Sequence, residues 1–457
     1  MQTFDAIIIG SGQAGTPLAF KLAAHKKKVA FIEKKHLGGT CLNVGCTPTK
    51  TYVASARRMW DAQHGEELGI NIPAGASADL SKIKARKDAL IKKSVDGITK
   101  GVANNKYITF FAGEAHFEGH KIVEVNGEQL TAEEIYINVG GRPFIPNSYE
   151  GLPYLTNETL LELGTLPEHL LIVGGSYIGL EFGQMFRRFG SQVTIIEMAD
   201  AIIGREDKET SLAIQRFMED EGTAFRLNAE CLSADLEKDG TIAAHLNCAK
   251  EGAVTIKGSH ILLAVGRRPN TDRLGLDKTG VETDSRGFIP VNDYLETNVA
   301  GIYALGDCNG KGAFTHTAYN DYEIVAENKF LGKDRKVSDR ILTYGLFADP
   351  PLGRVGMTQK EAMEQGLDIL VGHRPMSRVA RAKEKGETNG YMSVVVDAKS
   401  HKILGATVLG TGGDEVISTF VHAMHAGLSY ETLRDSVQPH PTVNELIPTM
   451  LEQLSKP

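Results

Sequence analysis

The sequence contains few cysteines and no long hydrophobic run. Five cysteines among 457 residues are too few for a secreted scaffold held together by disulfides. No apolar stretch approaches the roughly 20 residues of a membrane-spanning helix. A signal peptide is not expected either, because the chain does not open on a basic segment followed by a long apolar one. These absences predict a protein of the cytoplasm.

A surplus of positive charge is absent as well. The chain has 50 Lys and Arg against 57 Asp and Glu, so its formal net charge is −7. Nucleic-acid and anionic-membrane binders need a basic surface, and both classes are therefore disfavoured. The residue in excess is glycine, with 49, or roughly 11% against an average near 7%. The glycines are scattered and only 16 prolines accompany them, which indicates tight turns and close backbone approaches.

The chain begins with a strand, a glycine-rich turn, a helix and a second strand. Residues 4–9 are a short apolar run typical of a buried parallel strand, and a helical pattern then reaches His25. A second apolar strand at residues 29–32 closes with Glu33. The turn has the spacing G-x-G-x-x-G, with Gly10, Gly12 and Gly15. Because Glu33 follows at about the 20-residue spacing of a ribose-binding carboxylate, the pattern predicts a dinucleotide-binding unit.

The same plan recurs in the middle of the chain. An apolar strand at residues 170–173 precedes a second glycine-rich turn. A helix and a strand at residues 193–196 then lead to Glu197. The turn reads Gly174, Gly175, Ser176, Tyr177, Ile178 and Gly179. Ser176 replaces the middle glycine, but its small side chain can still let a pyrophosphate approach. Two such units predict two nucleotide-binding modules.

Three further features organise the chain. The motif at residues 138–143 is repeated at residues 264–269, each time after an apolar strand and at the end of one half of the repeat. Residues 81–105 predict a long helix whose lysines, among them Lys87, are expected on a solvated face. From about residue 340, strands and helices follow an α+β pattern.

The stretch from Gly38 to Lys50 carries two cysteines, Cys41 and Cys46. Three interpretations stay open on the residues alone. The thiols can be buried apolar groups, as cytosolic cysteines usually are. They can begin a zinc site, although with His36 they fall short of four ligands. They can also form a redox-active disulfide, which is favoured because a glycine-rich approach to a helix N-terminus stabilises the reactive thiolate. The other cysteines, expected to be buried or incidental, are Cys231, Cys248 and Cys308.

This stretch resembles the active-site segment of the class I pyridine nucleotide–disulfide oxidoreductases, the family of glutathione reductase, dihydrolipoyl dehydrogenase and mercuric reductase. The resemblance extends in order over essentially the whole chain. Gly306-Asp307 is similar to the family's second FAD motif, and His440-Pro441-Thr442 with Glu445 is similar to its catalytic His–Glu pair. The resemblance implies an α/β fold, with two Rossmann-like domains for FAD and NAD and a C-terminal α+β dimerisation domain. The implied boundaries are 1–145 and 265–335 for the two parts of the FAD domain, 146–264 for the NAD(P)H domain and 336–457 for the dimerisation domain.

The resemblance implies where both nucleotides bind. The FAD pyrophosphate is expected at the first helix N-terminus, with Glu33 at the adenosine ribose and Asp307 on the flavin side. The residues expected to bind FAD are Gly10, Gly12, Gly15, Glu33, Gly39, Thr40, Lys50, Gly140, Asp307 and Phe314. Those expected to bind NAD(H) are Gly174, Tyr177, Ile178, Gly179, Glu197 and Gly266.

The resemblance also assigns catalytic roles. Cys46 would lie against the isoalloxazine ring as the charge-transfer thiolate, and Cys41 would be the outer thiol that attacks the substrate. Lys50, paired with Glu181, would lie by the flavin N5, where a cation favours negative charge on the reduced flavin. Tyr177 matches the aromatic gate over the nicotinamide pocket.

His440 and Glu445 match the family's acid–base pair. Pro439 and Pro441 flank His440 and stiffen its backbone. Glu445 follows in a position to orient the ring, as a catalytic dyad requires. In the family this histidine reaches across a two-fold dimer, so an obligate homodimer with sites shared between the subunits is expected. No nucleic-acid, membrane or metal site is expected.

Glu197 predicts a preference for NADH. A carboxylate at the end of the second strand accepts hydrogen bonds from the ribose 2′-hydroxyl and repels a 2′-phosphate. The next arginine after Glu197 is Arg205, whereas an NADP site is expected to keep arginines nearby. NADPH is expected as a second, less favoured coenzyme.

The sequence constrains the identity of the substrate less than any other property. Within the family the chain resembles the mercuric reductase-like subgroup, which includes the reactive-chlorine-resistance flavoprotein, in Phe314-Thr315 with Asp321-Tyr322 and in residues 350–358. Efficient mercury reduction is not expected, because no cysteine follows Cys308, whereas mercuric reductase ends in a vicinal pair. The favoured function is NAD(P)H-dependent, FAD-containing reduction of a small disulfide through Cys41 and Cys46. The alternatives are a reductase of copper(II) or mercury(II) that uses the same dithiol, and a dihydrolipoyl dehydrogenase-like subunit of a multienzyme complex.

Overall fold

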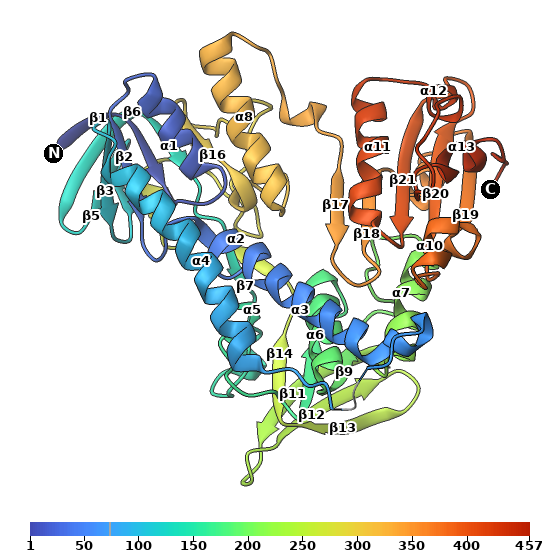
Figure 1. Ribbon diagram of the computed structural model, residues 1–457. Coiled ribbons are helices and arrows are strands. Elements are labelled where there is room, and N and C mark those ends of the chain that lie inside the picture. Colours follow the sequence, from blue (N-terminus) through green and yellow to red (C-terminus); the bar gives the residue numbers. More distant parts are fainter. Residues whose placement is uncertain (73–74) are drawn as a thin grey trace. The chain divides into compact units, whose positions relative to one another are not determined.

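The computed structural model describes residues 1–72 and 75–457, which divide into two compact units (Figure 1). Unit 1 comprises Met1–Thr51, Lys84–Phe144 and Gly266–Arg340. Unit 2 comprises Tyr52–Ile83, Ile145–Val265 and Ile341–Pro457. Helices α3 (Cys46–His64) and α4 (Leu80–Ala103) contribute residues to both. Each unit is thus assembled from segments that are far apart in the sequence, and the finer division into the predicted domains stays a prediction.

Unit 1 is built on a mixed sheet in the order β3-β2-β1-β6-β5-β4, with β16 also paired with β6. Strands β1, β2, β3, β6 and β16 run parallel, and β5 and β4 extend the sheet antiparallel. The apolar residues 6–9 of the central strand are buried, as expected for a strand covered on both faces. Its strands are β1 (Gln2–Ile9), β2 (Val29–Glu33), β3 (Ile108–Ala112), β4 (His116–Gly119), β5 (Ile122–Val125), β6 (Glu128–Ile137), β7 (Gly141–Pro143), β15 (Arg267–Pro269) and β16 (Ile302–Ala304). Its helices and 3-10 turns are α1 (Gly15–Ala24), α2 (Gly39–Asn43), α8 (Thr315–Leu331), η3 (Leu276–Lys278), η4 (Gly306–Asn309) and η5 (Val337–Asp339).

Unit 2 contains a parallel sheet in the order β10-β9-β8-β14 and two antiparallel sheets, β11-β12-β13 and β17-β18-β21-β20-β19. Its strands are β8 (His169–Val173), β9 (Gln192–Ile196), β10 (Ala224–Arg226), β11 (Ala229–Leu236), β12 (Ile242–Cys248), β13 (Gly252–Gly258), β14 (His260–Leu263), β17 (Thr343–Leu346), β18 (Leu352–Gly356), β19 (Ile369–Pro375), β20 (Tyr391–Asp397) and β21 (Ile403–Leu409). Its helices and 3-10 turns are α5 (Asn157–Leu160), α6 (Tyr177–Phe189), α7 (Lys208–Asp220), α9 (Gln359–Glu364), α10 (Ala380–Glu384), α11 (Gly413–His425), α12 (Tyr430–Arg434), α13 (Leu446–Leu451), η1 (Gly65–Leu68), η2 (Asn147–Tyr149) and η6 (Met376–Arg378).

Helix α11 shows how the C-terminal sheet is covered. Ile417, Phe420 and Ala423 recur at helical spacing and are all buried. They share one apolar cluster with residues of β18, β20 and β21 (Figure 1). The α+β pattern predicted for this part is therefore confirmed. No helix of the described residues is both long and apolar enough to cross a membrane.

The predicted long helix is α4, but one expectation about its lysines is wrong. Lys82 and Lys92 are exposed as predicted, whereas Lys87 is only 1% exposed. Lys87 lies four positions after Ile83 and four before Ile91, so helical periodicity puts it in the apolar stripe. Its ammonium group binds Asp88 Oδ1 at 2.8 Å.

Candidate active site

The two glycine-rich turns have the same backbone geometry. Gly10 and Gly174 have φ values of +102° and +110°, and each N–H donates at 2.8 Å to a carbonyl of the next parallel strand, β2 or β9. A Cβ on Gly10 would lie 2.3 Å from the Asn138 carbonyl oxygen, and one on Gly174 would lie 2.5 Å from that of Ala264. Only glycine fits either position.

The acidic residues that follow the turns are also held alike. Glu33 Oε2 accepts from the Ser11 N–H at 2.9 Å, and Glu197 Oε2 accepts from the Gly175 N–H at 2.7 Å. In both, Oε1 accepts from the N–H two residues further on, at 2.8 and 2.9 Å. Each carboxylate is therefore fixed at the carboxyl end of its strand beside the turn, where nucleotide riboses bind in such units.

Asn138 is a residue that sequence reasoning missed as part of the site. Its Oδ1 accepts from the Gly15 N–H at 2.9 Å, and its Nδ2 donates to the Leu305 carbonyl at 2.8 Å. It therefore ties the first turn to the segment that leads into Gly306. A signal was present in the sequence, because the matching position of the second repeat is Ala264, which cannot make these bonds.

The surface around this turn suits a pyrophosphate. Gly39 has φ +65°, and a Cβ there would lie 2.7 Å from Gly12 Cα. The backbone at Gly39 therefore lies in close contact with the backbone of the turn at Gly12. Gly140 has φ +63°, and a Cβ there would have no atom within 4 Å, which indicates open space. Asp307 follows Gly306 directly on η4. Burial raises the pKa of Asp307, and the positive charge of Arg267 opposes that rise. The glycines, the helix N-terminus and the two carboxylates fit a dinucleotide such as FAD.

The two cysteines of the motif lie close together in unit 1. Cys41 is in α2 and half-buried, whereas Cys46 is exposed and is the first residue of α3. A hydrogen bond with Cys46, burial and the charge of Cys46 all raise the pKa of the Cys41 thiol. No disulfide joins the described cysteines, and Cys248 and Cys308 are buried as expected. No cluster of three or more His, Cys, Asp or Glu among the described residues could hold a metal ion.

Thr315 is a second residue that the sequence did not assign to the site. Its Oγ1 lies 3.2 Å from Cys46 Sγ, and a hydrogen bond from Thr315 lowers the pKa of Cys41. The hydroxyl therefore contacts Cys46 and also favours the ionised form of Cys41. Thr315 is also the first residue of α8, whose positive N-terminal end adds to the stabilisation of a thiolate.

We expect Thr315→Val to raise the pKa of Cys46, because a hydrogen bond donated to a thiolate stabilises the charged form. The pH dependence of alkylation by iodoacetamide, in reduced protein that carries Cys41→Ser, measures this pKa. Thr315→Ser keeps the hydroxyl and is the matched control. A valine variant that titrates like the serine variant would contradict the contact.

His440 and Glu445 form the predicted pair in unit 2. His440 Nδ1 lies 2.8 Å from Glu445 Oε2. Because a carboxylate only accepts, the ring donates from Nδ1, and Nε2 is the atom left for proton transfer. The His440 side chain is 76% exposed and that of Glu445 is 15% exposed. The dyad is therefore oriented from within the chain and presents its reactive nitrogen outward.

Comparison with known proteins identifies the family. Residues 4–321 match the model described as pyridine nucleotide-disulphide oxidoreductase, and residues 343–451 match the dimerisation domain of these proteins. The chain belongs to this family. It is an FAD-dependent oxidoreductase that uses a pyridine nucleotide, and its dimerisation domain makes it a homodimer. The fold class predicted from the sequence is confirmed.

Relatives match along nearly the whole of this oxidoreductase. Dihydrolipoyl dehydrogenase of Thermus scotoductus is 35% identical over 463 residues, covering 100% of this chain and 98% of the relative. Mercuric reductase of Lysinibacillus sphaericus is 31% identical, over 97% of this chain and 81% of its own length. The solved structure of the Cu(II) complex of the HOCl-induced flavoprotein disulfide reductase RclA from Escherichia coli has a TM-score of 0.90 and 32% identity, and the match covers 99% of each chain. The resemblance inferred from the motifs is confirmed.

Other predicted site residues of this oxidoreductase lie in their expected elements. Tyr177 is the first residue of α6 and Ser176 is its N-cap. A Cβ on Gly179 would lie 2.0 Å from the carbonyl oxygen of Gly174, so the helix packs tightly on the turn. The buried Glu181 accepts from the Phe347 N–H at 3.0 Å. Lys50 falls in unit 1, so its pairing with Glu181 stays a prediction.

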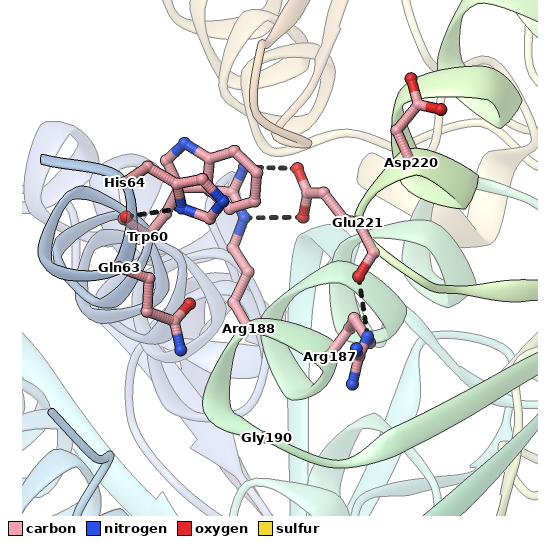
Figure 2. A pocket seen from close by; sticks show the side chains of 8 residues that line it. All are labelled: Trp60, Gln63, His64, Arg187, Arg188, Gly190, Asp220 and Glu221. Atoms are coloured by element: carbon pink, nitrogen blue, oxygen red, sulfur yellow. Dashed lines mark hydrogen bonds and ion pairs between the residues drawn. The ribbon is translucent and has the colours of Figure 1, made fainter. Parts of the chain in front are cut away.

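Unit 2 contains a cavity of about 280 Å³ (Figure 2). In its wall, Arg188 donates to the two carboxylate oxygens of Glu221 at 2.7 and 2.9 Å and also binds Asp349. The guanidinium lies 4.5 Å from the centre of the Trp60 ring, which stacks on His64 with 3.5 Å between the ring centroids. These charges neutralise one another within the protein, so the cluster anchors the C-terminal half of α3 to α6. No predicted site residue is among the described residues that line the cavity.

Proposed function

We propose that this protein is an NADH-preferring, FAD-dependent reductase of a small disulfide, and that Cys41 and Cys46 are its redox pair. The observation that carries the proposal is the pair of thiols, Cys41 in α2 and Cys46 at the start of α3. Cys46 raises the pKa of Cys41, the Thr315 hydroxyl lies 3.2 Å from Cys46 Sγ, and all three residues share unit 1 with the first glycine-rich turn. The thiols suit a reducing compartment such as the cytoplasm.

The residues of unit 1 fit FAD in this proposal. The turn at Gly10, Gly12 and Gly15 receives the pyrophosphate, Glu33 the adenosine ribose, and Asp307 the flavin side. The other FAD contacts proposed are Gly39, Thr40, Lys50, Gly140 and Phe314. In unit 2, the proposed contacts of the nicotinamide coenzyme are Gly174, Tyr177, Ile178, Gly179, Glu197 and Gly266. When bound, FAD supplies two-electron transfer from the nicotinamide to the disulfide, which restores the dithiol.

The two cysteines have different roles in thiol exchange. The negative charge of Cys46 opposes ionisation of Cys41, so Cys41 needs a base to become the attacking thiolate. His440, oriented by Glu445, is that base. The Cys41 thiolate attacks one sulfur of the substrate, the S–S bond breaks, and one thiol leaves with a proton from His440. The Cys46 thiolate then attacks Cys41 Sγ, the bond from Cys41 to the substrate breaks, and the second product leaves as a thiolate that takes its proton from water. Two electrons have then passed from the dithiol to the substrate.

The active site is proposed to be shared between the subunits of the homodimer. The His440–Glu445 dyad belongs to the matched dimerisation domain and is oriented from within its own chain. Its exposed ring is free to serve a dithiol outside its own unit. We therefore place His440 of one subunit at the cysteines of the other.

Changing Glu197 is expected to weaken the preference for NADH. Glu197→Ala removes the carboxylate that would bind the ribose hydroxyls and repel a 2′-phosphate, so the ratio of kcat/KM for NADH to that for NADPH should fall about tenfold. Arg226 on β10 pairs with Ile196, the residue before Glu197. Its guanidinium lies 3.6 Å from the Glu251 carboxylate. The exposed Glu230, replaced by alanine, is the control. An unchanged ratio in Glu197→Ala would refute the assignment.

Turnover of chosen acceptors tests the proposed function. Oxidised glutathione, lipoamide, other small disulfides and copper(II) would each be offered with NADH to the purified holoenzyme. The disulfide proposal expects at least one disulfide to turn over. The relative solved as a Cu(II) complex supports a second candidate, reduction of copper(II) by the same dithiol. Reaction with copper(II) and with no disulfide would establish that second candidate.

A further inference from the structure

A buried carboxylate binds the tyrosine of the second glycine-rich turn. The Tyr177 hydroxyl donates to Glu206 Oε1 at 3.1 Å, and the Tyr344 hydroxyl donates to the same oxygen at 2.6 Å. The side chain of Glu206 is 0% exposed. A carboxylate withdrawn from water in this way makes strong hydrogen bonds with the donors that face it.

The second oxygen of Glu206 faces a buried arginine. Arg354 Nε lies 3.5 Å from Glu206 Oε2, and the arginine side chain is 1% exposed. Neither of these two atoms has a hydrogen-bond partner among the described residues. Burial raises the pKa of Glu206, and the two hydroxyls and the charge of Arg354 oppose that rise. Arg354 thus balances the negative charge of Glu206, while Oε1 accepts the hydrogen bonds of the two tyrosines.

The segment that carries Glu206 is fastened to the turn. The Ile203 N–H donates to the Gly175 carbonyl at 3.0 Å, and the Glu206 N–H donates to the Ile203 carbonyl at 2.9 Å. Ile203 is β-branched but has φ +41°, a conformation such residues rarely adopt. Backbone of this kind persists where the surroundings impose it, often at binding sites. The loop is therefore shaped to bring Glu206 beside Tyr177.

Tyr177 is consequently held in one orientation. Its ring meets that of Tyr344 edge to face, with 5.7 Å between centroids and 76° between planes. Burial and the charge of Glu206 raise the pKa of Tyr177, so the phenol stays protonated and continues to donate.

We propose that Glu206 is a positioning residue that latches Tyr177 over the nicotinamide part of the coenzyme site, so that coenzyme entry must break the hydrogen bond between them. This inference rests on the proposed function, in which the Tyr177 ring covers that pocket. The work of opening the latch is subtracted from the affinity for coenzyme. Releasing the latch should therefore tighten binding, a gain that structural damage would not produce.

Tyr177→Phe tests the latch because it removes the hydroxyl and keeps the ring. The Kd of the holoenzyme for NAD⁺, measured by isothermal titration calorimetry, should fall about tenfold. The rate constant for NADH association, measured by stopped flow, should rise. Tyr391→Phe is the matched control, because it removes another buried hydroxyl of unit 2, which lies 2.7 Å from Thr210 Oγ1. Its Kd should equal that of the wild type.

Glu206→Gln is an independent test of the latch. It keeps an oxygen for the hydroxyl but loses the charge, so Kd should fall by a smaller factor, about threefold. The double variant Tyr177→Phe/Glu206→Gln should bind as Tyr177→Phe does, because without the hydroxyl Glu206 no longer acts on the ring. A Kd for Tyr177→Phe within about twofold of the wild type, or additive effects in the double variant, would overturn the latch. Wild-type holoenzyme that neither binds NAD⁺ nor is reduced by NADH would overturn the proposed function and the latch with it.

Discussion

Replacing Cys41 or Cys46 with serine is expected to lower the turnover of a disulfide substrate by on the order of 10³-fold or more. In the proposed mechanism, Cys41 provides the attacking sulfur, and Cys46 releases it by closing the internal disulfide. Serine can do neither. Its hydroxyl is a poor nucleophile at neutral pH, and it cannot form a disulfide with the remaining cysteine. Initial rates with NADH and the best disulfide acceptor measure the loss.

Controls separate the dithiol from the rest of the electron path. Ferricyanide takes electrons one at a time and needs no thiol exchange, so NADH–ferricyanide activity should survive in both serine variants. Cys231→Ser, in unit 2, should retain disulfide turnover at the wild-type level. The assignment of the redox pair fails if either serine variant keeps disulfide turnover within about tenfold of the wild type.

The two variants should also differ from the wild type in how their thiol count responds to NADH. Reduction of the wild type by NADH should expose two thiols more than the oxidised form has, because the Cys41–Cys46 disulfide opens. Neither serine variant can form that disulfide, so its thiol count should not change with NADH. Titration of the denatured protein with a chromogenic disulfide reports this count independently of any substrate.

Features set by local backbone geometry could be predicted from the sequence. Gly10 and Gly174 are required where the turn has positive φ and meets a carbonyl, and Glu33 and Glu197 recur at a fixed distance from those turns. Each of these requirements depends only on a short stretch of sequence. The closeness of Cys41 and Cys46 was predictable for the same reason, since both thiols and the start of α3 lie within one segment.

Contacts between distant segments were not predictable in this way. Asn138 meets Gly15 across 123 residues, and Thr315 meets Cys46 across 269 residues. Comparison of the two repeats singles out Asn138 but not its partners, and nothing local distinguishes Thr315 from other polar residues, because the fold alone decides what these side chains face. The antiparallel pairing of β7 with β15 is of the same kind: the repeated motif was visible, but the two copies pair with each other. Lys87 differs, because helical periodicity would have placed it in the apolar stripe, but its charge led to the wrong prediction of a solvated side chain.

His440→Gln is expected to lower disulfide turnover by about 10²- to 10⁴-fold, the usual contribution of general acid–base catalysis. The variant keeps a polar side chain but cannot take the proton of Cys41 or protonate the leaving thiol. Glu445→Gln should lose less, because it disturbs the orientation of the ring and leaves the imidazole in place. NADH–ferricyanide activity should persist in both, which would show that flavin reduction is intact. Equal disulfide turnover in His440→Gln and the wild type would remove His440 from the mechanism.

A heterodimer decides whether His440 serves the dithiol of its own chain or of the partner. One subunit would carry Cys41→Ser and a first affinity tag, the other His440→Gln and a second tag, and purification on both tags would select the mixed dimer. If the site is shared, the intact cysteines of one subunit meet the intact histidine of the other. One of the two sites is then complete, and about half of the wild-type turnover should return. If each site lies within one chain, both sites are broken, and the heterodimer should be as inactive as the two parent variants.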